Sequence, residues 1–103
     1  MAFDGTEGGE ITLEEGAILT ARYRATHPLQ RKGHFFGKEI LNDILARPGC
    51  VGIRMYHGLD TLLRHEMVLV GADAEGDDML DLVADKGLPC PASCPQPNEL
   101  NPR

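Results

Sequence analysis

The alternation of apolar and polar residues is clearest in the middle of the chain. Val51, Ile53 and Met55 alternate with residues of the opposite kind, which is the two-residue period of a strand with one buried face. Every residue from Met67 to Val70 is apolar, as expected of a strand that is covered on both faces. Together these stretches predict a β-hairpin over residues 50–72, and most of the preceding chain is expected to pack on it.

The loop that closes this hairpin is apolar for a loop. It runs from Gly58 to Arg64 and contains Leu59, Leu62 and Leu63. Either these leucines cover the core or they form an exposed contact patch.

A first helix is predicted from Thr12 to about Thr26. Thr12 and Glu15 have the spacing of a capping box, in which each side chain bonds to the other residue's backbone amide. Pro28 disfavours helical backbone at the preceding residue, so it should end this helix. One face of the helix is narrow and made mostly of small residues, namely Leu13, Ala17, Ala21 and Ala25.

A second helix is predicted to start near His34 and to end at residues 47–49, where Arg-Pro-Gly stops it. Its apolar residues recur at helical spacing in two adjacent rows and form the broadest apolar stripe in the chain. These residues are Phe36, Ile40, Leu41, Ile44 and Leu45.

The segment after the hairpin is less clearly patterned. Met79, Leu82 and Val83 have helical spacing, acids precede them and Lys86 follows. A short helix from Met79 to Lys86 is therefore favoured over a third strand.

The chain beyond this segment is rich in proline, which excludes a helix or a central strand. Five of the seven prolines lie there, at Pro89, Pro91, Pro95, Pro97 and Pro102. We expect an acidic flexible tail over residues 1–10, one domain over residues 11–87 and an extended Pro/Cys-rich tail over residues 88–103. The last of these is either draped over the domain or detached from it.

The predicted fold class is α+β. Two N-terminal helices pack on a small antiparallel sheet built on the central hairpin, and the proline-rich tail follows. A two-stranded sheet is marginal by itself, and its edges need a partner. We expect those edges to be covered by the tail or paired with another copy.

Composition narrows the classes of function. The net charge of −6 argues against general binding to nucleic acid or an anionic membrane. The start of the chain is acidic and lacks the apolar region of a signal peptide, and no apolar run is long enough to span a membrane. The expected compartment is therefore the cytoplasm.

One candidate site for chemistry is the pair Cys90 and Cys94. Two thiolates in a proline-framed loop could supply half of a tetrahedral zinc site, and His57, His65 or Cys50 could complete it. A local disulfide and two unligated thiols are the alternatives, and a single cysteine pair favours the last of the three.

Charged residues are segregated along the chain. In one interpretation the two segments are solvated faces without a specific role. In the functional interpretation a basic patch on one copy contacts an acidic patch on the next copy. The basic patch could also bind phosphate or RNA, although few aromatic residues are available for base stacking. The basic patch comprises Arg22, Arg24, Arg31, Lys32 and Lys38, and the acidic patch comprises Asp73, Glu75, Asp77, Asp78 and Asp81.

The sequence contains no phosphate-binding glycine loop, nucleophile elbow or zinc-protease motif. The leading hypothesis is a small non-enzymatic protein-interaction or self-assembly module, which acts as a homo-oligomer and has no cofactor. A zinc-binding protein and a phosphate or RNA binder that uses residues 22–38 are the alternatives.

Overall fold

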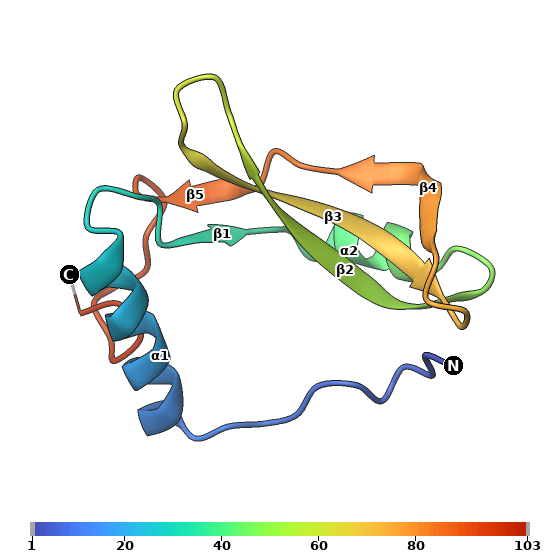
Figure 1. Ribbon diagram of the computed structural model, residues 1–103, viewed down its shortest axis with the longest axis horizontal. Coiled ribbons are helices and arrows are strands. Elements are labelled where there is room, and N and C mark those ends of the chain that lie inside the picture. The colour runs from blue at the N-terminus through green and yellow to red at the C-terminus, as the bar shows by residue number, and fades with distance from the viewer. Residues whose placement is uncertain (1, 103) are drawn as a thin grey trace.

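The computed structural model describes residues 2–102. The elements are α1 (Leu13–Thr26), β1 (Gly33–Phe35), α2 (Lys38–Leu45), β2 (Cys50–Leu59), β3 (His65–Asp73), β4 (Asp78–Ala84) and β5 (Leu88–Cys90) (Figure 1). They form one three-stranded sheet, in the order β2-β3-β4, and one two-stranded sheet of β1 and β5. The predicted α+β class with a central hairpin is confirmed.

The hairpin of β2 and β3 is the longest pairing in the molecule. The two strands run antiparallel, with Ile53 opposite Gly71 and Leu59 opposite His65. A bulge interrupts the register between Cys50 and Gly52. The period-2 pattern of the first strand and the apolar run of the second therefore predicted this hairpin correctly.

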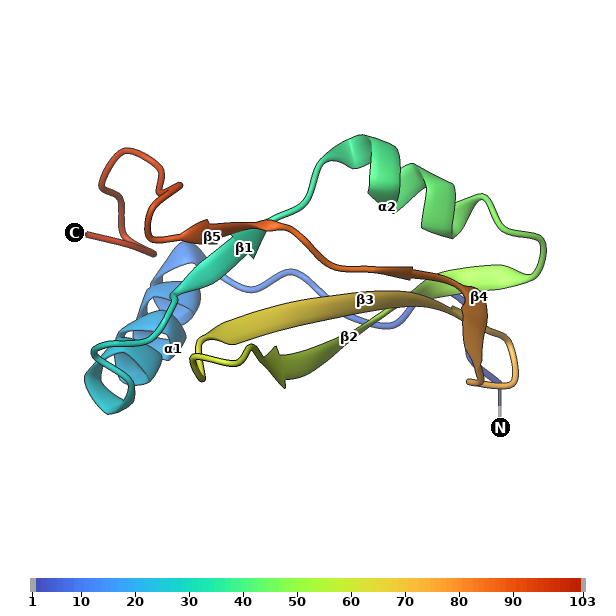
Figure 2. The same cartoon turned by 90° about the horizontal axis from the view of Figure 1, so that it is seen from above.

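The core lies between this sheet and α2, which covers one face of it (Figure 2). Ile44 of α2 and Leu69 of β3 are 0% and 1% exposed, and Ala84 of β4 packs with them. The backbone approaches closely here, because a Cβ on Gly71 would lie 3.0 Å from the sulfur of Cys50. Most of the predicted apolar stripe thus packs in the core, including Ile40 and Leu41, whereas Leu45 is 48% exposed.

Two predicted elements are wrong and need correction. Residues 79–86 do not form a helix, because Asp78–Ala84 is strand β4, which pairs antiparallel with β3. An ion pair between Asp81 and Arg47 holds this strand close to the C-terminal end of α2. Helical spacing of three apolar residues was therefore outweighed by the backbone hydrogen bonds that the second edge of β3 offers.

The second helix also starts later than predicted. His34 lies in strand β1, and α2 begins at Lys38 with Gly37 as its N-cap. Strand β1 pairs with β5 of the proline-rich tail, with His34 opposite Pro89. The backbone groups of residues that the periodicity assigned to a helix thus form hydrogen bonds with a short strand near the end of the chain.

Helix α1 stands apart from this core. Its predicted capping box is present, with Glu15 N donating to Thr12 Oγ1 at 3.0 Å and Thr12 N donating to Glu15 Oε1 at 2.9 Å. None of its residues is buried. It lies beside the end of the hairpin rather than under the core of the sheet (Figures 1 and 2). Small apolar residues on a helix face therefore did not lead to close packing.

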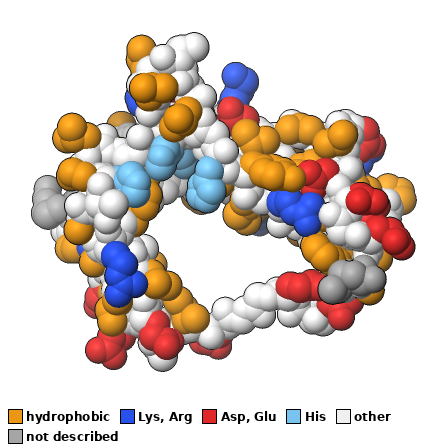
Figure 3. Space-filling model, viewed as in Figure 1, with side chains coloured by type: hydrophobic (Ala, Val, Ile, Leu, Met, Phe, Trp, Pro, Cys, Tyr) orange, Lys and Arg blue, Asp and Glu red, His pale blue; other side chains and the backbone are white. Residues whose placement is uncertain are grey.

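The N-terminal arm, residues 2–11, is extended and returns to the far end of the sheet. Phe3 N donates to the carbonyl of Ala74 at 2.8 Å, and Arg54 lies over the Phe3 ring at 5.4 Å from its centroid. The arm, α1 and the sheet surround an opening (Figure 3). The radius of gyration of 15.2 Å exceeds the roughly 13 Å typical of a compact chain of this length.

Candidate functional site

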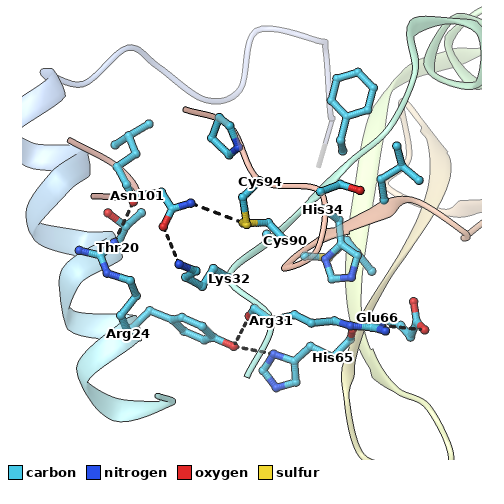
Figure 4. Close-up of a pocket in the computed structure, with 18 of the residues that line it drawn as sticks. Thr20, Arg24, Arg31, Lys32, His34, His65, Glu66, Cys90, Cys94 and Asn101 are labelled. Carbon is cyan, nitrogen blue, oxygen red and sulfur yellow. Dashed lines mark hydrogen bonds and ion pairs between the residues drawn. A yellow bond between two sulfur atoms is a disulfide. The ribbon is translucent and has the colours of Figure 1, made fainter. Parts of the chain in front are cut away.

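A cavity lies between α1, the small β1–β5 sheet and the loop end of the hairpin. Its volume is about 860 Å³. Apolar side chains from four parts of the chain line it, among them Leu19, Phe35, Met67 and Leu100. Figure 4 shows the polar residues of the same walls, which come from α1, β1, β3 and the C-terminal tail. The cavity is therefore formed by residues that are far apart in the sequence.

A hydrogen bond between Tyr23 and His65 joins α1 to β3 at this cavity. The hydroxyl of Tyr23 lies 2.7 Å from Nδ1 of His65 and 3.2 Å from the carbonyl oxygen of Arg31. The hydroxyl has one proton, so it donates to one of these atoms at a time. When it donates to the Arg31 carbonyl, its oxygen can still accept a hydrogen bond from His65 if Nδ1 carries the proton.

The connector after α1 adds four bonds to the hairpin loop and the start of β3. Gln30 Oε1 accepts from the amide of His65 at 2.8 Å, and Gln30 Nε2 donates to the carbonyl of Leu63 at 3.1 Å. Arg31 donates to the His65 carbonyl at 3.0 Å and pairs with Glu66 at 3.2 Å. The connector thus satisfies backbone groups at the base of the hairpin loop and fixes the position of His65.

Four histidines gather at this end of the molecule. The His27 ring stacks on Tyr23 at 4.5 Å between centroids and lies 6.0 Å from the His65 ring. His34 and His57 line the same cavity, and histidines form one group on the face seen in Figure 3. Burial, and then the charges of His27, His57 and His34, lower the pKa of His65 below its usual 6.5.

The cysteine pair forms another wall of the cavity. Cys90 and Cys94 are joined in a disulfide, so the favoured alternative of two unligated thiols was wrong. Asn101 is nearly buried; its Nδ2 donates to Cys90 Sγ at 3.4 Å, and its Oδ1 accepts from Lys32 Nζ at 2.6 Å. The carbonyl of Leu100 accepts from Arg24 at 2.8 Å. The tail is therefore draped over the domain and tied to α1 and β1.

The predicted zinc ligands lie close to one another without forming a ligand set. His57, His65, Cys90 and Cys94 all line the cavity. Within residues 2–102, no group of three or more His, Cys, Asp or Glu side chains is arranged to hold a metal ion. Cys50, the other proposed ligand, lies against Gly71 in the core and not at the cavity. Zinc binding stays a prediction, and it would require the disulfide to be reduced.

The two charged patches lie at opposite ends of the molecule. Arg24, Arg31 and Lys32 line the cavity, whereas Arg22 and Lys38 do not. The acidic residues lie at the end of β3, in the turn after it and in β4. Asp78 binds Arg54 and accepts from Tyr56 at 2.6 Å. The Tyr56 hydroxyl and then the Arg54 guanidinium hold the pKa of Asp78 below its usual value.

Three of the five acidic side chains, those of Asp73, Asp78 and Asp81, have bonding partners within the chain. Asp73 Oδ1 accepts from the amides of Glu75 and Asp77 at 2.9 and 3.0 Å, and Asp81 binds Arg47. A contact between copies through these acids would therefore compete with bonds inside the chain. The head-to-tail contact stays a prediction, as does phosphate or RNA binding through residues 22–38.

The three leucines of the hairpin loop are exposed rather than packed on the core. Leu59 is 59% exposed, and Leu62 and Leu63 are each 68% exposed. The loop is held by Asp60, which accepts from the amides of Leu62 and Arg64 at 2.8 and 2.9 Å. Of the two alternatives for this loop, the structure shows the exposed apolar patch.

The sequence did not single out Tyr23, Gln30 or Asn101, which connect the walls of the cavity. The spacing of Tyr23 and His27 could have indicated a stacked pair on one helix face, since residues four apart are neighbours. Nothing local marks Gln30 or Asn101, because their partners lie 35 and 11 residues away.

No family model, curated protein or solved structure matches this chain. Among residues 2–102, no helix has the length and apolarity needed to cross a membrane.

Proposed function

We propose that this protein is a non-enzymatic interaction module that self-associates through the outer edge of β2. One observation carries the proposal. Strand β2 is ten residues long, and within the described residues it pairs along one side alone, with β3. Long edge strands present a row of backbone donors and acceptors, which a strand of another chain can pair with.

The two outer edges of the large sheet differ in charge and regularity. Both expose apolar side chains, Met55 and Leu59 on β2 and Leu80 and Val83 on β4. Strand β4 also carries two carboxylates, and such charges discourage pairing with another strand. The bulge of β2 lies at its Cys50 end, so the rest of that strand is regular. The regular edge, which carries no carboxylate, is therefore the better template for a second copy.

The exposed hairpin loop extends this surface. Leu62 and Leu63 follow directly after the end of β2 and add apolar area beside the strand edge. Antiparallel pairing of two β2 strands would be two-fold symmetric, so each copy would contribute the same residues. Two three-stranded sheets would join in one sheet of six strands, and these edges would no longer be exposed.

Sedimentation velocity over a range of protein concentrations tests this proposal. We expect the wild type to self-associate and Met55→Lys to remain monomeric at the same concentrations, because a lysine on an edge strand opposes pairing. Leu29→Lys is the matched control, since Leu29 is 100% exposed and lies outside the sheet. A wild type that stays monomeric at high concentration would refute the proposal. The same conclusion would follow if Met55→Lys and Leu29→Lys weakened self-association equally.

A further inference from the structure

We infer that the cavity between α1, the β1–β5 sheet and the hairpin binds a small amphipathic anion, such as an organic carboxylate or sulfonate with an apolar body. This site is separate from the β2 edge proposed for self-association. Its volume, about 860 Å³, lies within the roughly 300–1,000 Å³ of pockets that hold small ligands. Three properties of its walls select the chemistry of the ligand.

The first property is an apolar interior surface. Leu19, Phe35, Leu88 and Leu100 all line the cavity, and each stays between 44% and 64% exposed. Leaving such side chains in water is unfavourable, by about 25 cal/mol for each Å² of apolar surface. An aliphatic or aromatic ligand body would cover these side chains together.

The second property is the sign of the charges. Three cationic residues, Arg24, Arg31 and Lys32, line the cavity, against one carboxylate, that of Glu66. Arg31 pairs with Glu66, and Arg24 donates one bond to a neutral carbonyl. A guanidinium has five N–H donors, so Arg24 keeps donors for a ligand. Because the whole chain has a net charge of −6, preference for an anion would have to come from the cations at this cavity, and Arg24 is one that the described carboxylates leave unpaired.

The third property is the set of histidines at the same walls. His34, His57 and His65 line the cavity. A neutral imidazole can donate or accept a hydrogen bond, and a protonated one is a cation. Either form accommodates a carboxylate or sulfonate, and the protonated form opposes an organic cation.

Calorimetric titration with three ligands that share one tail tests the inference. Decanoate, decanol and decylammonium have the same apolar chain and differ in the charge of the head. We expect decanoate to bind at least about tenfold more tightly than decanol, as a charge-assisted hydrogen bond allows, and decylammonium to bind most weakly. Equal affinities for decanoate and decanol would overturn the anion preference. Failure of all three ligands to bind would overturn the cavity as a ligand site.

Two neighbouring arginines on α1 provide a matched pair of variants. Arg24→Gln should remove most of the ratio between decanoate and decanol affinity while decanol binding stays unchanged. Arg22→Gln makes the same charge change on the same helix outside the cavity lining, and it should keep the ratio. Arg24→Lys should recover part of it. If Arg24→Gln also lost decanol binding, the Arg24→Lys variant would provide the test. If Arg24→Lys bound decanoate no more tightly than decanol, the proposed role of this cation would be contradicted.

Ligand binding by the monomeric variant distinguishes this cavity from the β2 edge proposed for self-association. Met55→Lys does not alter the cavity lining, so it should bind decanoate like the wild type. If a second copy filled the cavity instead, decanoate affinity would fall as protein concentration rises, and it would increase in the monomeric variant. That result would overturn the small-ligand site and would leave self-association intact.

Discussion

The hydroxyl of Tyr23 on α1 lies 2.7 Å from Nδ1 of His65, 42 residues further along the chain. This contact matters because α1 buries none of its residues and is positioned by polar bonds. Tyr23→Phe keeps the ring and its stacking on His27 but loses the hydrogen bond. We expect a loss of about 1 kcal/mol in unfolding free energy, seen as a fall of roughly 4–8 °C in Tm by circular dichroism.

A double-mutant cycle gives the control for this prediction. Tyr23→Phe and His65→Ala, each of which removes one partner of the hydrogen bond, should show a coupling energy of roughly 0.5–1.5 kcal/mol if the two side chains bond directly. Strictly additive effects would mean that the two residues stabilise the protein independently of each other.

The lowered pKa of His65 predicts a loss of stability in mild acid. The folded protein holds His65 with a pKa below 6.5, while the unfolded chain has the usual value. The unfolded state therefore binds more protons in this window, so unfolding free energy falls as the pH decreases from 6.5 through the folded pKa. Urea denaturation at several pH values between about 7 and 5 measures this fall in unfolding free energy.

His65→Gln removes the titrating group but keeps an acceptor for Tyr23, so it should flatten this pH dependence. His57→Gln, which keeps His65, should retain most of the slope. A wild-type slope that is unchanged in His65→Gln would assign the effect to other groups.

Reduction of the Cys90–Cys94 disulfide should loosen the C-terminal wall of the cavity. The bond closes a very short loop, for which chain-entropy arguments give a stabilisation of about 2 kcal/mol. We expect a reducing agent to lower the Tm of the wild type and to leave that of a Cys90→Ala/Cys94→Ala double variant unchanged. Mass spectrometry of the alkylated protein reports the redox state in parallel.

The zinc prediction can be tested in the same samples. If zinc added to the reduced wild type restores its Tm, and fails to do so with His57→Ala or His65→Ala, the four predicted ligands form a site. Structural zinc sites bind the metal tightly and keep it during purification. A zinc content below about one tenth of an equivalent after loading would therefore exclude this zinc site.

Gly76 should be intolerant of a side chain. It has φ of +84°, and a Cβ there would lie 3.0 Å from the Phe3 ring. Gly76→Ala should therefore cost about 1–2 kcal/mol through strain and displacement of the arm. Gly8→Ala shares the positive φ of +94° but meets nothing within 4 Å, so it isolates the strain. Thermal unfolding and the chemical shifts of the Phe3 ring compare them; equal effects would show that the arm contact contributes nothing.

Elements with strong local patterns could be predicted from the chain alone. The alternation around Ile53, the apolar run that ends at Val70 and the capping box at Thr12 each depend on neighbouring residues. The stripe that includes Ile44 likewise specified which face of α2 is buried. Short elements were misassigned, since β1 and β4 acquire their conformation from distant partners, β5 and β3.

By itself, the sequence determined the α+β class, the central hairpin and the segregation of charge, because periodicity and caps act over a few residues. The tertiary structure alone decided that Tyr23, His65 and Asn101 line one cavity and that Cys90 and Cys94 are bonded. It also decided that β2 is an outer strand of the sheet, since strand order depends on which distant segments pair. Such contacts depend on the closure of long loops and on shared burial, for which neighbouring residues carry no pattern.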